Sequence, residues 1–251
     1  MVSGLGRIPF VDAHCHVYGI SKERLRKIVE EIVIVGVAED YETSRRIIEL
    51  SQQLPNIVPM IGLHPWKVPS VAEEELRNIL SLIDRARGLG EIGLDGKTRA
   101  LDKQIRFFEE QLKVASEYDL PVNIHSRAAW QEIANLLLKY EIKTAIWHWY
   151  SGPTEFLKDF EAQGYFITIN PSVIFQDKHL KVLERAPMSI ILTESDGPYN
   201  YRGKYLTPAE IPSLVSFIAR VKQTTAKRVK QRIWENFRKI FPDIRFESRK
   251  Y

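Results

Sequence analysis

The chain has little cysteine and no long hydrophobic run. Cys15 is the only cysteine among 251 residues, which excludes an intrachain disulfide framework and favours a reducing compartment. The longest aliphatic run, IVIVGVA at residues 32–38, is far too short to cross a bilayer. Residues 1–10, MVSGLGRIPF, lack the basic and apolar regions of a signal peptide. We therefore expect a cytoplasmic protein with no membrane partner.

Linkers, low-complexity tracts and internal repeats are also absent from the sequence. With 44% hydrophobic and 27% charged residues, the composition is that of an ordinary globular protein, and one domain over residues 1–251 is the expected organisation. The formal net charge of +4 permits an anionic partner such as nucleic acid. Basic and acidic residues are interspersed, however, so the charge alone does not establish such a partner.

Short β-branched runs alternate with amphipathic segments along the whole chain. Residues 40–54 and 100–118, for example, carry apolar side chains at helical spacing. The expected strands span residues 9–14, 31–38, 56–63, 88–94, 121–125, 144–149, 165–170 and 189–194. Eight such units predict an α/β fold of the (β/α)8 TIM-barrel type, in which functional residues lie where strands enter their following loops. The rival is an open doubly wound sheet, which usually carries a glycine-rich phosphate loop; a P-loop, GxxxxGKS or GxxxxGKT, is absent.

The segment FVDAHCHVYG places His14 and His16 two residues apart beside Asp12. On a strand, residues two apart project to the same face, so these three side chains point one way while Cys15 points the other and packs as an inert residue. Two imidazoles at the mouth of a barrel can bind a divalent metal ion. Two polar residues at a strand end would give the same pattern, so other residues must decide.

Candidate partners occur at the ends of later strands. Glu91 lies in the fourth expected strand, His125 ends the fifth, His148 lies at the end of the sixth, and Asp196 follows the eighth. Each alone has an ordinary explanation, such as a structural histidine or a turn before Gly197. Their joint position at the catalytic rim predicts a metal centre.

Seven segments of the chain are similar to a known family. VDAHCH, GLHP, GEIGLD, LPVNIHSR, HWYSG, ILTESDGPY and ENFRKIF resemble the TatD-type metal-dependent hydrolases of the amidohydrolase superfamily, in the same order over residues 10–241. Members of that family are described as deoxyribonucleases. The resemblance implies two divalent metal ions, with His14, His16 and Asp196 on one ion, His125 and His148 on the other, and Glu91 bridging both.

Such a centre has a clear chemical use. Two cations about 3.5–4 Å apart can clamp a phosphodiester and lower the pKa of a bound water toward 7. Glu91 would serve as the bridge, and Asp196 would orient the water and exchange its proton as general acid and base. Imidazole ligands favour Zn, Mn, Fe or Co over Mg, although magnesium supports activity in the family, so the metal's identity stays open.

Four residues near these ligands are expected to contact an anionic substrate. His64 at the end of the third expected strand and Arg127, two residues past His125, are placed to meet it. Arg202 and Lys204, after the eighth strand, resemble the family's RGK loop and are candidate phosphate contacts, since guanidinium can bind phosphate bidentately. Ordinary surface charge explains the basic ones equally well. Glu194 is a candidate to support a ligand from behind, or a structural carboxylate.

The chain departs from the family pattern at several pocket positions: Gly96 replaces an aromatic residue, Trp66 a histidine, Trp149–Tyr150 a Cys–Phe pair and Asn170–Pro171 a Ser–Gly pair. The new aromatic side chains can stack on nucleobases or simply pack in the barrel.

Three classes of function fit the sequence. The first is a two-metal phosphodiesterase that acts on DNA or another nucleotide phosphodiester, with single-stranded DNA cleaved from an end as the specific expectation. The second is an amidohydrolase acting on an amide, a lactone or another small-molecule ester, and the third is a metal-binding barrel without activity. Amidases of this type commonly bridge their metals with a modified lysine, whereas here Glu91 occupies the fourth strand and Lys97 follows six residues later. The sequence does not show the oligomeric state.

Overall fold

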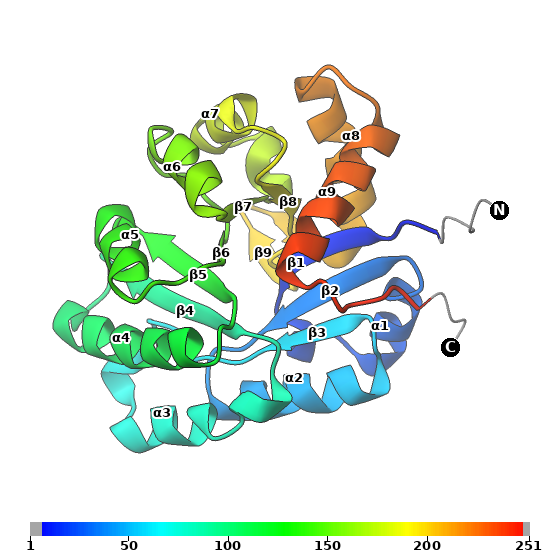
Figure 1. Ribbon diagram of the computed structural model, residues 1–251. Coiled ribbons are helices and arrows are strands. Elements are labelled where there is room, and N and C mark those ends of the chain that lie inside the picture. The colour runs from blue at the N-terminus through cyan, green and yellow to red at the C-terminus, as the bar shows by residue number, and fades with distance from the viewer. Residues whose placement is uncertain (1–6, 248–251) are drawn as a thin grey trace.

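Eight parallel strands surround the centre of the molecule, and helices pack on the outside of this ring (Figure 1). The computed structural model describes residues 7–247. The strands are β1 (Phe10–Cys15), β2 (Ile32–Val37), β3 (Ile57–Met60), β4 (Leu89–Asp95), β5 (Val122–Arg127), β6 (Ala145–Trp147), β7 (Phe166–Ile169) and β8 (Ile191–Thr193). All eight expected strands are therefore confirmed, most of them shorter than predicted.

Hydrogen bonds at two junctions close the ring into a barrel. The strands pair in the orders β1-β2-β3 and β4-β5-β6-β7-β8. A parallel bridge between Ile61 and Leu89 joins β3 to β4. On the other side, the backbone N–H of Asp196 donates to the carbonyl oxygen of His14 at 3.0 Å, which joins the end of β8 to β1. The (β/α)8 TIM barrel predicted from the sequence is confirmed.

The helices cover the barrel with their apolar faces. They are α1 (Lys22–Ile28), α2 (Tyr41–Gln53), α3 (Glu73–Leu80), α4 (Leu101–Glu117), α5 (Trp130–Lys139), α6 (Phe156–Gln163), α7 (Asp177–Arg185), α8 (Ile211–Val221) and α9 (Ala226–Ile240). The helices expected at residues 40–54 and 100–118 are α2 and α4. Strands β2 and β4 are buried at every position, as in parallel sheets covered on both faces. Among residues 7–247, no helix has the length and apolar character needed to span a membrane.

A short antiparallel hairpin, absent from the sequence prediction, follows β8. It consists of β9 (Tyr199–Tyr201) and β10 (Lys204–Leu206). The two residues between the strands, Arg202 and Gly203, have φ angles of 50° and 83°. Positive φ at both positions is the requirement of the type I′ turn, whose twist matches that of the paired strands.

Residues 88–93, GLGEIG, have the glycine spacing GxGxxG of a dinucleotide-binding loop. In such loops the motif forms a tight turn between a strand and a helix. Here most of the segment lies inside β4, so its glycines do not form a phosphate-binding loop.

Gly93 is required where β4 passes β5. Its φ is 138°, a conformation that other residues rarely adopt, and a Cβ atom at this position would collide with the backbone carbonyl oxygen of His125. This close approach sets the distance between β4, which carries Glu91, and β5, which carries His125. The glycine therefore positions two of the candidate ligands.

We expect Gly93→Ala to destabilise the protein by about 2–5 kcal/mol, because strain and a backbone clash add together. Gly164→Ala is the matched control: Gly164 also has a positive φ, 76°, but its nearest neighbour would lie 3.7 Å from the new Cβ. The control should lose only about 1–2 kcal/mol. Urea unfolding of both variants measures the difference, and equal losses would mean that the clash with β5 is relieved without cost.

Candidate metal centre

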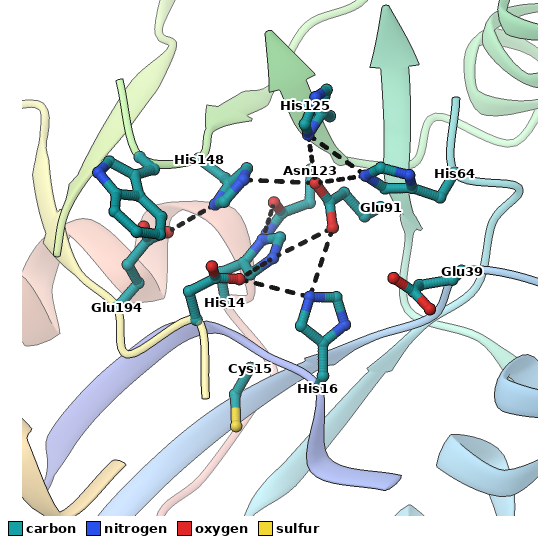
Figure 2. Close-up of polar contacts among 12 residues, drawn as sticks. His14, Cys15, His16, Glu39, His64, Glu91, Asn123, His125, His148 and Glu194 are labelled. Carbon is teal, nitrogen blue, oxygen red and sulfur yellow. Dashed lines mark hydrogen bonds and ion pairs between the residues drawn. The ribbon is translucent and has the colours of Figure 1, made fainter. Parts of the chain in front are cut away.

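The predicted metal ligands converge at the carboxyl ends of the barrel strands (Figure 2). They are His14 in β1, His16 just after it, Glu91 in β4, His125 in β5, His148 just after β6 and Asp196 after β8. All are buried except His16, whose side chain is 17% exposed. The barrel thus brings together six side chains that lie up to 182 residues apart in sequence.

The carboxylate of Glu91 stands at the centre of this group (Figure 2). Its Oε2 lies 3.4 Å from Nε2 of His14 and 3.6 Å from Nε2 of His16. Its Oε1 lies 2.8 Å from Nδ1 of His125 and 3.3 Å from Nε2 of His148. Each oxygen therefore faces a different set of imidazoles, which is the arrangement that a bridging ligand needs.

Asp196 completes one side of the group. Its Oδ1 lies 3.4 Å from Nε2 of His14 and 3.3 Å from Nε2 of His16. Within residues 7–247, Nε2 of His14 is buried and has no hydrogen-bond partner. A buried imidazole nitrogen between two carboxylates is a position that suits a cation.

Hydrogen bonds hold the outer nitrogens of His14 and His148. Nδ1 of His14 donates to Oδ1 of Asn123 at 2.8 Å, and Nδ2 of Asn123 donates to the carbonyl oxygen of Ala13 at 2.9 Å. Nδ1 of His148 donates to Oε2 of Glu194 at 3.2 Å. Each imidazole thereby presents Nε2 to the centre, as metal-binding histidines do when a second group fixes the ring. Glu194 lies in the supporting position expected for it.

His125 and His16 are held in the same way. Nε2 of His125 donates to Oδ2 of Asp95 at 3.2 Å, and the indole N–H of Trp66 donates to the same oxygen at 2.6 Å. The hydroxyl of Tyr18 is hydrogen-bonded to Nδ1 of His16 at 3.2 Å. His125 therefore directs Nδ1 to the centre, whereas His16 directs Nε2.

Three of these supporting residues were missed in the sequence. Asn123 precedes His125 by two residues, Asp95 follows Glu91 by four, and Tyr18 follows His16 by two. Because side chains at even spacing share one face of a strand, the same rule that grouped the ligands would have found Asn123 and Asp95.

The electrostatics of the site favour positive charge. Burial alone would lower the pKa of His14, but the carboxylates of Glu91 and Asp196 raise it well above 6.5. Burial would also lower the pKa of His125, but hydrogen bonds to Asp95 and Glu91 raise it to about 9. Although burial opposes ionisation, the neighbouring histidines hold the pKa of Glu91 well below 4.5. The carboxylates are therefore ionised, and protons or metal ions on the histidines balance them.

His64 occupies a second position beside Glu91. Its Nε2 lies 3.1 Å from Oε1 of Glu91, and with His125 these atoms form a group compact enough to hold an ion. Its Nδ1, however, accepts the backbone N–H of Trp66 at 3.1 Å. Burial, reinforced by His125, lowers the pKa of His64, so the ring is neutral and carries its proton on Nε2. In this form His64 donates its Nε2–H to Oε1 of Glu91.

A cavity of about 620 Å³ opens above the centre. Of the predicted substrate contacts, His64 and Arg127 line it, and the guanidinium of Arg127 lies 3.7 Å from Oδ2 of Asp95. Among the described residues, Arg202 and Lys204 are not part of this lining. Nζ of Lys204 is instead paired with Glu210 at 3.0 Å.

The aromatic residues that depart from the family pattern have different environments. Tyr150 is fully buried, and its hydroxyl donates to the carbonyl oxygen of Pro153 at 2.7 Å, so it packs in the core. Trp66 is 50% exposed and lines the cavity with its indole fixed by Asp95. Trp149 also lines the cavity. Of these three aromatic residues, only Trp66 and Trp149 are therefore placed to meet a substrate.

Two further residues considered in the sequence lie away from the centre. Cys15 points to the opposite side of β1 (Figure 2), where its Sγ donates to the carbonyl oxygen of Gly197 at 3.1 Å. Lys97 is exposed in the loop after β4. It does not lie among the imidazoles that surround Glu91.

Comparisons with known proteins agree with this architecture. The family model described as TatD related DNase matches residues 11–242. Human deoxyribonuclease TATDN3 is 29% identical over 264 residues, covering 95% of this chain and 96% of that protein. A protein of Methanocaldococcus jannaschii described as an uncharacterized metal-dependent hydrolase is 28% identical over 247 residues, covering 93% and 97%.

The solved structure of YjjV, a TatD homologue from Escherichia coli K12, has the same fold. It aligns with a TM-score of 0.84 at 23% identity and covers 92% of this chain and 97% of that one. The resemblance seen in the sequence motifs is thus confirmed. Because the family match spans nearly the whole chain, this protein belongs to the TatD related DNase family.

Proposed function

We propose that this protein is a metal-dependent phosphodiesterase that hydrolyses single-stranded DNA from an end. The observation that carries the proposal is the Glu91 carboxylate, with one oxygen facing His14 and the other facing His125. A carboxylate between two ligand groups suits two cations about 3.5–4 Å apart, the separation found in two-metal phosphoryl-transfer sites. Family membership and the deoxyribonuclease name of the human relative support the same reaction class.

The residues present fit such a metal centre. The unpartnered Nε2 of His14, buried between two carboxylates, is the clearest sign that a cation belongs there. We assign His14, His16 and Asp196 to one ion, His125 and His148 to the other, and Glu91 to both. Divalent ions at these positions would polarise phosphoryl oxygens and lower the pKa of a bound water toward 7. The imidazole-rich ligand set favours zinc, manganese, iron or cobalt over magnesium.

Asp196 is the proton acceptor in this proposal. Burial would raise its pKa, but the adjacent imidazoles of His14 and His16 lower it, so the carboxylate is ionised at neutral pH. Its Oδ1 faces the two imidazoles, which leaves Oδ2 to accept a proton from the attacking water. The backbone hydrogen bond from Asp196 to His14 fixes this carboxylate relative to β1.

His64 and Arg127 are the groups that would orient the phosphodiester. Neutral His64 lines the cavity, and its Nε2–H, which donates to Oε1 of Glu91, would be available to a phosphoryl oxygen once Glu91 bound metal ions. Arg127 lies at the mouth with a side chain that is 59% exposed, where it can bind a phosphate further along the strand. A cavity of about 620 Å³ is in the size range of a small-ligand site, so it admits a strand terminus more readily than an intact duplex.

The amidohydrolase alternative is less well supported. The barrel itself serves many unrelated reactions, so the choice must come from the site. The site carries Glu91 where a modified lysine would be expected for a binuclear amidase, and Lys97 is exposed outside it. These features favour the phosphodiesterase.

Asp196→Asn should lower kcat on single-stranded oligonucleotides by about 100- to 10,000-fold, because amide nitrogen and oxygen cannot take up the proton of the attacking water. The variant should remain folded. Asp159→Asn, an exposed position on α6, is the control and should keep wild-type turnover. Circular dichroism and metal content establish that both variants are intact.

Wild-type turnover by Asp196→Asn with its metal content intact would show that Asp196 is not the proton acceptor. Loss of folding in this variant alone would show that the carboxylate is a structural element. If wild-type protein binds metal but cleaves neither DNA nor small esters and amides, the barrel is a binding protein.

A linear single strand should be degraded, whereas a circular single strand of identical sequence should resist, because only the former offers an end to the cavity. Gel analysis of the two substrates side by side tests this. With one to three phosphate contacts, the slope of log binding constant against log salt should be shallow, about −0.7 to −2. Equal cleavage of both substrates would exclude an obligatory end, and hydrolysis of an amide or lactone panel alone would favour the amidohydrolase class.

A further inference from the structure

Four aromatic side chains form a continuous surface on one side of the cavity mouth. The ring of Trp149 lies 5.1 Å from that of Tyr201 and 6.4 Å from that of Tyr199, in both cases edge to face. The ring of Phe175 stacks on Tyr201 at 5.9 Å. We call these four residues the aromatic wall. Trp149, Tyr199 and Tyr201 line the cavity, and Phe175 supports Tyr201 from outside it.

The wall keeps aromatic area exposed that a purely structural cluster would bury. Tyr199 is 44% exposed and Phe175 is 40% exposed. Trp149 has a φ of 41°, which is unfavourable for a large side chain by about 1–2 kcal/mol. Backbone strain at a ligand site can fix the direction of a side chain. The strained residue, Trp149, directly follows His148, a candidate metal ligand.

The hairpin β9–β10 separates its aromatic residues onto two faces. Tyr199 and Tyr201 are two residues apart and share one face, the face that meets Trp149. Tyr205 is paired with Asn200, so it lies on the opposite face. Tyr205 is 50% exposed but lies outside the cavity lining. Tyr205 is therefore a matched control for Tyr199 and Tyr201, because it is an exposed aromatic residue of the same hairpin that does not line the cavity.

The wall adjoins the metal centre. The rings of Trp149 and His148 are 6.3 Å apart, so a phosphate held at the centre has the wall directly beside it. The guanidinium of Arg202 lies 5.4 Å from the centroid of the Tyr201 ring. A nucleotide is complementary to this site, because its anionic phosphate and its flat aromatic base lie within a few ångströms of each other.

We propose that the aromatic wall stacks the nucleobase of the nucleotide whose phosphate is held at the metal centre. This inference rests on the proposed phosphodiesterase function and adds the part of the substrate that the wall recognises. Stacking accepts every base, because each has a π face, so the wall gives preference for an unpaired nucleotide without sequence selection. A base in a duplex is already stacked and paired, and the wall thereby also favours single strands.

The test compares binding of thymidine 5′-monophosphate and 2-deoxyribose 5-phosphate to the manganese-loaded protein by calorimetry. The two ligands share phosphate and sugar, and only the first has a base. Wild-type protein should bind the nucleotide about 5- to 150-fold more tightly. A variant with Tyr199→Leu and Tyr201→Leu should lose at least about fivefold of this preference, whereas Tyr199→Phe with Tyr201→Phe should retain it. Tyr205→Leu should leave it unchanged.

Several outcomes would overturn the inference. They are equal binding of the two ligands by wild-type protein, binding of neither, or an undiminished preference in the double leucine variant. If that variant does not fold, Tyr201→Leu alone makes the same comparison. The proposed nuclease function is tested separately, by cleavage of oligonucleotides. If the protein prefers the nucleotide but cleaves no oligonucleotide, the aromatic wall is still a nucleotide-binding site, but the nuclease function is wrong.

Discussion

A buried carboxylate surrounded by imidazoles is the interaction on which the rest of the site depends. Glu91 is almost fully enclosed, and an isolated anion in such a place is very unfavourable. The imidazoles of His14, His125 and His148 compensate it, through protons or through the cations that replace them. Each of these rings is in turn held by a second polar group on its outer side. The site for positive charge therefore consists of a central carboxylate, a shell of imidazoles around it and an outer shell of polar groups that hold the imidazoles.

This constraint also explains the roles of residues that never face the cavity. Asn123, Asp95 and Glu194 are buried polar side chains whose hydrogen bonds set which nitrogen each histidine directs inward. Asp95 also anchors Trp66, so one carboxylate fixes both a candidate ligand and a residue of the cavity. The centre and its walls are consequently coupled, and a change in one supporting group affects both.

The sequence predicts the barrel and its centre well because both follow from a regular pattern. Eight β–α units determine the fold, and alternation along a strand places His14 opposite Cys15. The pattern fails where strands end. The sequence pattern predicts a sixth strand that includes residue 149, but β6 stops at Trp147. Trp149 then takes a positive φ, and Tyr150 turns into the core. The hairpin after β8 has strands of only three residues, too short to give a hydrophobic signal, and the pairing of Lys204 depends on the fold of the segment that follows.

The proposed position of Glu91 between two metal ions can be tested directly. Anomalous X-ray scattering at the zinc or manganese edge, from crystals grown with that metal, measures their number and positions directly. We predict two peaks flanking the Glu91 carboxylate, one beside His14, His16 and Asp196 and the other beside His125 and His148. A single peak, or two peaks of which only one contacts Glu91, would contradict this account.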